Sequence, residues 1–407
     1  MARYARRWTM ANAPGVIDAR LVLPRATPAF TIHRRVWLGG GSWSTAVPLL
    51  PQHAWRLLRW RAGGWRRGVA SIRRERLAQV ADSMGIDPGL VEARLASLAR
   101  RHGIPPGEAL HFGLVAADGL TRWPEYVYRN EERWNAAAGG ARGARQVLAL
   151  GDKVATAERL AAAGVPTVPS LLVPPLPPGA DWRRKALDWL DRWPQVHVKR
   201  RHGSRGVGAF ELSEDRRLVL RQFQHDEAEA DPVAWMAANA TGHELLVQPR
   251  LESHAALVDV ADPSDVVTIR AVTRDLGGGP ELFCSWIEVP LPIAEGRQFY
   301  VLSRIDGDGV IRELAVAQWW RKELLDETRE SGRQSAAVAA SLRGRTVPGY
   351  AELVRHALLA HRQFPGLFAA AWDVAVTSEG NLFLEGNGGF GVDTPQVISG
   401  GLLRGIS

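Results

Sequence analysis

Residues 368–387 alternate polar and apolar side chains in the manner of a β-hairpin, and this pattern constrains how the C-terminal part of the chain folds. Side chains along a strand point to alternate faces of the sheet. The first face is apolar and is expected to be buried; it carries Trp372, Val374, Val376, Leu382 and Leu384. The second face carries Asp373, Ala375, Phe383, Glu385 and Asn387.

The turn of this hairpin determines which side chains meet across it. A three-residue turn at 378–380 pairs Thr377 with Asn381 and places Asp373 directly opposite Glu385, with Asn387 two residues further along. Directly opposed carboxylates repel each other, and a cation between them removes that cost. Because Mg²⁺ prefers oxygen ligands, Asp373, Glu385 and Asn387 are candidate ligands. Taken alone, the pattern fits a surface hairpin with a solvated polar face equally well.

Lysine is rare in this chain and therefore informative. Arginine supplies almost all of the basic charge, and the lysines are Lys153, Lys185, Lys199 and Lys322. A lysine is a compact point charge, whereas an arginine is a planar fork. Lys199 ends an expected strand, and the glycine-rich stretch that follows contains Gly203, Ser204, Gly206 and Gly208. Such a loop lets backbone N–H groups approach phosphate, although by itself it also fits a flexible turn.

Three weaker signals lie in the same part of the chain. Lys153 follows Asp152 at the start of an expected helix over 153–163, where its charge opposes the helix dipole unless an anion compensates it. An apolar strand is expected over 244–250, and its end leads through Gln248, Pro249 and Arg250 to Leu251. Because a proline lies at this end, not all backbone groups there are paired within a sheet, and the unpaired groups suit the binding of a flat heterocycle. A strand over 266–273 carries Arg270, which suits phosphate oxygens.

The order of these segments resembles the ATP-grasp superfamily over about residues 147–395, and most closely its members associated with sugar transfer. The resemblance implies an α+β fold in which two lobes hold ATP. It also implies that Lys153 and Lys199 contact phosphates, that 203–208 forms a lid, that 248–251 binds adenine, and that Asp373, Glu385 and Asn387 bind Mg²⁺. Two positions depart from the pattern of glutamate-ligase relatives: Thr268 stands where an acidic residue is usual, and a ribose-binding acid is not evident beyond Glu252.

The resemblance further implies an ADP-forming ligase. A substrate carboxylate would form an acyl phosphate, which an amine or another nucleophile would then attack, while Arg270 stabilises the transferring phosphoryl group. One alternative is an ATP-dependent phosphotransferase on the same fold. Another is a non-enzymatic basic protein that binds anionic surfaces. The substrates expected are a small-molecule, peptide or glycan-precursor carboxylate and its nucleophile.

The N-terminal region of the chain is basic and is expected to be mainly helical. Residues 1–150 hold 23 arginines and 10 acidic residues, a net charge of +13, and the remainder of the chain is mildly acidic. We expect a helical region over 1–145 and an ATP-grasp domain over 146–407, divided into 146–243 and 244–407. The break at 85–89, where Asp87 and Pro88 suit a helix start, predicts two helices within 75–101.

Residues 44–74 interleave Trp55, Trp60 and Trp65 with arginines. A helix whose tryptophans dock on the protein's own core is favoured over one that rests on the inner face of a membrane, and nucleic acid is not an expected partner. The single Cys284 excludes an intrachain disulfide and fits a reducing cytoplasm. No apolar run of 18 residues occurs and no apolar segment follows Arg3, Arg6 and Arg7, so neither a membrane span nor a secretory signal is expected.

Overall fold

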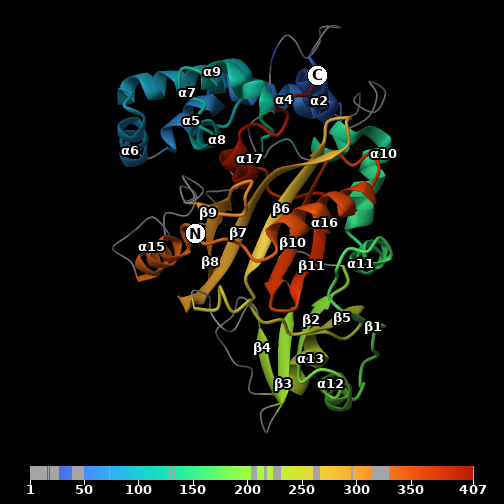
Figure 1. Ribbon diagram of the computed structural model, residues 1–407. Helices are drawn as coiled ribbons and strands as arrows, with labels where there is room; N and C mark the ends of the chain where they lie inside the picture. The colour runs from blue at the N-terminus through green and yellow to red at the C-terminus, as the bar shows by residue number, and fades with distance from the viewer. Residues whose placement is uncertain are drawn as a thin grey trace.

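A computed structural model describes residues 27–38, 50–72, 74–128, 134–202, 209–214, 218–222, 231–259, 266–294, 297–312 and 330–406, together with Val16, Asp18 and Glu131. The N-terminal part of the described chain is helical, and the C-terminal part contains two sheets (Figure 1). Within the described residues, no helix combines the length and the apolar character that a membrane span requires. The expected α+β class is confirmed, since both sheets are entirely antiparallel and carry helices on their faces.

The front of the described chain is helical, as expected. Asp87 caps the second of the two helices predicted within 75–101 by accepting a hydrogen bond from the Leu90 N–H at 2.9 Å. Trp60 is buried and donates from Nε1 to the carbonyl oxygen of Ala99 at 2.7 Å, so this tryptophan docks on the protein's own core. The elements are α2 (Pro28–Trp37), α4 (Leu50–Arg59), the π-helix η3 (Trp60–Gly64), α5 (Trp65–Ala70), α6 (Arg74–Met84), α7 (Pro88–His102), α8 (Pro106–His111), α9 (Gly119–Arg122), η4 (Trp123–Glu125) and α10 (Trp134–Leu150).

The smaller sheet has five strands in the order β1 (Leu171–Val173), β5 (Leu245–Pro249), β2 (Gln195–Arg200), β3 (Phe210–Glu214) and β4 (Leu218–Gln222). On β2, Val196 and Val198 are buried in a core that the helices α12 (Trp182–Leu190) and α13 (Pro232–Asn239) complete. Strand alternation therefore turns His197 and Lys199 to the opposite face.

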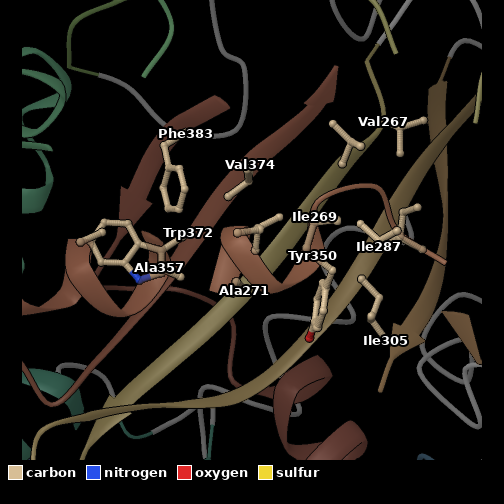
Figure 2. Close-up of a cluster of buried hydrophobic side chains, with 14 of the residues drawn as sticks. Val267, Ile269, Ala271, Ile287, Ile305, Tyr350, Ala357, Trp372, Val374 and Phe383 are labelled. Atoms are coloured by element: carbon tan, nitrogen blue, oxygen red, sulfur yellow. The ribbon is translucent and has the colours of Figure 1, made fainter. Parts of the chain in front are cut away.

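The larger sheet has six strands in the order β11 (Gly380–Asn387), β10 (Ala369–Thr377), β6 (Thr268–Asp275), β7 (Pro280–Ala294), β8 (Arg297–Ile305) and β9 (Ile311–Arg312). Figure 2 shows the apolar side chains of one of its faces, among them Ile269, Ile287 and Trp372, which pack under α16 (Tyr350–Arg362). The helix α15 (Glu330–Leu342) contacts β8, and α17 (Asp393–Ser399) contacts β7 on the other face.

The hairpin β10–β11 differs from the expected hairpin in its turn. Thr377 pairs with Gly380, so two residues form the turn where three were expected. A β-bulge at Asp373/Val374 adds one residue to β11 and restores the predicted pairing of Asp373 with Glu385. The predicted faces of β11 were therefore partly wrong. Phe383 lies in the core beside Trp372, whereas Leu382 and Leu384 are only half-buried.

The two sheets are joined beside this hairpin. The helix α11 (Lys153–Ala162) contacts β11, and the chain that follows α11 runs along the same strand. The N–H of Phe383 donates to the carbonyl oxygen of Pro166 at 2.8 Å, and Thr167 forms a parallel bridge with Phe383. These contacts bring the edge of the larger sheet close to the smaller sheet (Figure 1).

Candidate active site

Asp373 lies at the centre of the candidate site because both neighbouring strands place charged residues opposite it. It pairs with Arg270 on β6 and with Glu385 on β11. Between Glu385 and Asn387, Gly386 faces Trp372, and a Cβ at this glycine would lie only 2.5 Å from the indole ring. Glycine at this position allows β11 to pack on Trp372 while Glu385 and Asn387 share the other face.

Arg270 and Asp373 form a two-pronged ion pair. Nε of Arg270 lies 2.5 Å from Oδ1 of Asp373, and Nη2 lies 2.9 Å from Oδ2. The guanidinium also lies 3.9 Å from Glu288 and 6.0 Å from the centre of the Trp286 ring. The two bonds hold the planar guanidinium of Arg270 in a fixed orientation, and the charge of Glu385 also acts on it.

Glu385 is the anion that compensates the positive charge of Lys153. Asp152 caps α11 by accepting from the backbone N–H groups of Val154 and Ala155, which places Lys153 at the first helical position. There its Nζ lies 3.2 Å from Oε2 of Glu385. The unfavourable interaction of this lysine with the helix dipole is thus offset by a carboxylate from the larger sheet.

Lys199 reaches the same group of charges from the smaller sheet. Burial lowers the pKa of Lys199, Glu385 and Asp373 oppose this shift, and the charge of Lys153 adds to it, so that the pKa is about 8. The structure therefore brings the two predicted phosphate-contacting lysines together, although 45 residues separate them in the sequence.

The two carboxyl groups differ in their affinity for a proton. Burial raises the pKa of Asp373, Arg270 opposes this shift, and Glu288 and Glu385 add to it, so that the pKa is about 6. Burial acts in the same direction on Glu385, but Lys153 and Lys199 outweigh it and hold the pKa of Glu385 below its usual value. Glu385 is thus the firmly ionised member of the pair near neutral pH.

The three predicted metal ligands lie next to one another. Asn387 Nδ2 lies 3.1 Å from Oδ2 of Asp373 and 3.3 Å from Oε1 of Glu385, so the three predicted ligands are adjacent. In the part of the chain that the structure describes, no three His, Cys, Asp or Glu side chains form a potential metal-binding group. Two carboxylates and an amide suit Mg²⁺, which usually takes its other ligands from water and phosphate.

Arg201 is a residue of this site that the sequence analysis missed. Its Nε and Nη2 donate to the two carboxylate oxygens of Asp152 at 3.0 and 2.6 Å, and Nη1 donates to Glu244 at 3.1 Å. The side chain thereby connects the end of the strand that carries Lys199 to the cap of the helix that carries Lys153. Nothing in the sequence singled it out, because it lies in an Arg-Arg-His run of an arginine-rich chain.

The predicted adenine segment lies beside Lys199 in the smaller sheet. Gln248 pairs with His197 and shares its face with Lys199, and it is buried, with Nε2 donating to Ser170 Oγ at 2.8 Å. Pro249 ends β5, and Arg250 donates to Gln195 Oε1 at 2.6 Å. Leu251 follows and is half-buried. The adenine-binding role of 248–251 stays a prediction, and Gly203, Ser204, Gly206 and Gly208 lie outside the described residues.

No protein-family model matches the chain, and no curated protein matches it. Among solved structures, it is similar to D-cycloserine synthetase DcsG, with 15% identity over 64% of this chain and 68% of that chain and a TM-score of 0.35. It is similar to the ATP-grasp ligase PsnB in complex with a phosphomimetic precursor variant, Mg and ADP, with 14% identity, coverage of 67% and 63%, and a TM-score of 0.35. It is also similar to the D-alanine-D-alanine ligase from Coxiella burnetii, with 15% identity, coverage of 66% and 64%, and a TM-score of 0.36.

The chain thus spans about two thirds of the length of each of these three structures. One of them, PsnB, is named as an ATP-grasp ligase. ATP-grasp is the superfamily that the sequence motifs resemble. Their names do not mention sugar transfer, so that narrower resemblance stays a prediction. With TM-scores below 0.5, these similarities do not assign an activity to this chain.

Proposed function

We propose that this chain is an ATP-dependent ligase of the ATP-grasp type, which joins a carboxylate to an amine or another nucleophile and releases ADP and phosphate. One observation carries the proposal. Lys153, Lys199 and Arg270 come from three different elements and gather around Asp373 and Glu385. Holding three half-buried cations together costs free energy unless anions pair with them, and the triphosphate of a nucleotide would supply negative charge beyond that of Asp373 and Glu385.

The proposed reaction has two displacements. An oxygen of the substrate carboxylate attacks the γ-phosphorus of ATP, the bond from that phosphorus to the β–γ bridging oxygen breaks, and ADP leaves. The nucleophile then attacks the carbonyl carbon of the acyl phosphate, loses its proton to solvent, and displaces inorganic phosphate. No side-chain nucleophile is required, so the contribution of the chain is positioning and charge neutralisation.

Each charged residue has a distinct role in this proposal. Lys153 and Lys199 hold phosphate oxygens, because a point charge tolerates the changing geometry of a transferring group. Arg270 stabilises the charge of the transferring phosphoryl group, which requires it to exchange part of its pairing with Asp373 for the substrate. Asp373, Glu385 and Asn387 would hold Mg²⁺, which supplies charge neutralisation of the phosphates when bound.

The N-terminal helical region is proposed to make substrate or surface contacts and no nucleotide contacts. On α4, Trp55 is 60% exposed and Leu58 is 63% exposed, and the Arg59 guanidinium lies 5.9 Å from the centre of the Trp55 ring. These features support surface contact, whereas Trp60 has an internal structural role. The boundary proposed at 145 falls inside α10, which runs from Trp134 to Leu150. This proposal holds for a helical region that is surrounded by cytoplasm on all sides. It holds equally for a helical region that rests on the inner face of the membrane.

The experiment that tests the activity is incubation with Mg-ATP and pooled carboxylates and amines, with mass detection of products. A ligase gives a condensed product together with ADP and inorganic phosphate, and a carboxylate labelled with ¹⁸O transfers one labelled oxygen to the phosphate. A phosphotransferase gives a phosphorylated product and no condensation. Binding is tested separately, since Mg-ADP at about 100 times its dissociation constant should add about 2.7 kcal/mol to the free energy of unfolding.

A further inference from the structure

A cavity of about 610 Å³ lies where the N-terminal helices meet α17, away from the paired carboxylates. Figure 1 shows α17 beneath α8 at the junction of the helical region with the larger sheet. Apolar side chains from three segments form part of its wall: Met84 at the end of α6, Phe112 after α8, and Val397 on α17. A space of this size and composition suits the apolar body of a small organic molecule.

The polar part of the wall converges on a single point at Gly400. A Cβ built on this glycine would lie 3.1 Å from Nη2 of Arg122, 3.8 Å from Oη of Tyr126 and 3.9 Å from Nη1 of Arg404. Gly400 has a φ of +86°, a conformation that disfavours a side chain, and it caps α17 through its N–H to the carbonyl oxygen of Gln396. Three potential donors on the wall of the cavity therefore lie close together beside Gly400.

The charged side chains that line the cavity are positive, and Glu125 and Asp118 lie close behind Arg122 and Tyr126. Arg122 has acidic neighbours outside the cavity, since its Nε lies 3.4 Å from Glu125 and its Nη1 lies 3.8 Å from Asp118. Its Nη2 is the atom nearest Gly400. Among the described residues that line the cavity, Arg122, Arg404 and His111 are basic and none is acidic. Burial raises the pKa of Tyr126, so its hydroxyl stays protonated and can donate.

A buried glutamine links three backbone groups behind the wall. Gln396 accepts from the N–H groups of Val127 and Leu402 at 2.8 and 3.1 Å, and it donates to the carbonyl oxygen of Val127 at 2.7 Å. The C-terminal turn that carries Arg404 is fixed by Arg274, which donates to the carbonyl oxygens of Leu402 and Arg404. Donors positioned before a ligand arrives lose less entropy when it binds.

We propose that this cavity binds an organic carboxylate, with the anionic group between Arg122, Tyr126 and Arg404 and an apolar or aromatic body against Met84, Phe112 and Val397. The site is distinct from the proposed nucleotide site. Arg274 on β6 touches the rim of the cavity four residues from Arg270, which corresponds to roughly 13 Å along a strand. The proposal therefore does not depend on ATP or on the ligase reaction.

Isothermal titration of the full chain with 4-phenylbutyrate tests the proposal. Two molecules of the same shape serve as controls, the neutral 4-phenylbutanol and the cationic 4-phenylbutylamine. We expect the carboxylate to bind at least ten times more tightly than the alcohol, and we expect no measurable binding of the amine. Equal binding of acid and alcohol would show that the basic residues do not recognise the anion, and absence of any heat with the acid would overturn the site.

Two variants locate the binding. Arg404→Gln removes one charged donor from an exposed position and should weaken 4-phenylbutyrate about tenfold without changing the melting temperature. The matched control Arg355→Gln removes an exposed arginine that pairs with Glu352 on α16, and it should leave the affinity unchanged. A second variant, Met84→Trp, fills the apolar end and should also weaken binding. Unchanged affinity in both cavity variants would place the ligand elsewhere and overturn the proposal.

Discussion

Lys153 Nζ lies 3.2 Å from Glu385 Oε2, so the first residue of α11 is held by a carboxylate near the end of β11. This contact changes what removal of the carboxylate is expected to do. Strand pairing alone suggests that Asp373 and Glu385 repel each other and that losing one charge relieves the fold. The lysines instead hold the pKa of Glu385 below its usual value despite burial, so its charge contributes stability near neutral pH.

We expect Glu385→Gln to lower the melting temperature of the nucleotide-free protein, corresponding to about 1–3 kcal/mol, because Lys153 loses a charged partner. Turnover should fall by about 100-fold or more, because a proposed metal ligand is lost. Thermal melts and steady-state rates measure the two effects. Glu379→Gln in the exposed turn is the matched control and should change neither. A rise in melting temperature for Glu385→Gln would show that repulsion between the carboxylates dominates after all.

Lys199→Met should have opposite effects on stability and on binding. Burial lowers the pKa of Lys199 to about 8, which means that its charge is carried at a cost in the folded state. The methionine variant should therefore melt at a higher temperature and bind Mg-ADP at least tenfold more weakly. Lys199→Arg should not restore full affinity, because a planar fork does not fit a position built for a point charge. Lys185→Met, at a half-exposed position on α12, serves as the control.

The hairpin register shows what a sequence pattern can and cannot determine. The alternation of Asp373, Glu385 and Asn387 with apolar neighbours indicated one polar face, and that face exists. The turn was predicted one residue too long, and the β-bulge opposite Asp373 supplied the residue that kept the pairing. A bulge depends on packing across the sheet, here of Phe383 and Gly386 on Trp372, and single-strand alternation does not reveal it.

Other parts of the site follow the same division between local and long-range information. Helix caps such as Asp87 and Asp152 depend on neighbours in sequence and were predicted. The scarcity of lysine pointed to Lys153 and Lys199, and the structure brings them together. The contact of Arg201 with Asp152 joins residues 49 apart, and the cavity at Gly400 joins residues within 83–126 to residues within 396–404. Such contacts arise only from tertiary packing.

Arg201→Gln should weaken nucleotide binding although Arg201 is not proposed to touch the nucleotide. Its contact with Asp152 fixes the separation of Lys153 from Lys199. We expect about a tenfold loss of Mg-ADP affinity and a similar loss for Asp152→Asn. The double variant should show no additional loss, because each single change already breaks the same contact between Arg201 and Asp152. Arg200→Gln is the control, because that side chain donates to the carbonyl oxygen of Asn239 instead. Additive losses would mean that the two residues act independently.

The stability of the helical region should depend on pH through His33 and Glu131, which are both 1% exposed. His33 Nδ1 lies 2.6 Å from Glu131 Oε1, and Nε2 lies 2.9 Å from the carbonyl oxygen of Pro124. Both neighbours accept hydrogen bonds, so the ring satisfies both only when it is protonated. Burial lowers the pKa of His33, but the charge and hydrogen bond of Glu131 outweigh it, and the net pKa lies above 6.5.

Because the pKa of His33 is higher in the folded protein than in the unfolded chain, its contribution to stability is complete below pH 6.5 and is lost as the pH rises through the raised value. Denaturant unfolding at several pH values from about 6 to about 9 measures this loss. His33→Gln should be less stable than the parent by about 3 kcal/mol at the acid end, because Glu131 stays buried without a cationic partner. The difference should shrink as the pH rises, since the parent histidine also loses its charge. His243→Gln, at an exposed position, should follow the parent at every pH, and a difference between His33→Gln and parent that did not change with pH would mean that His33 is neutral in the folded state.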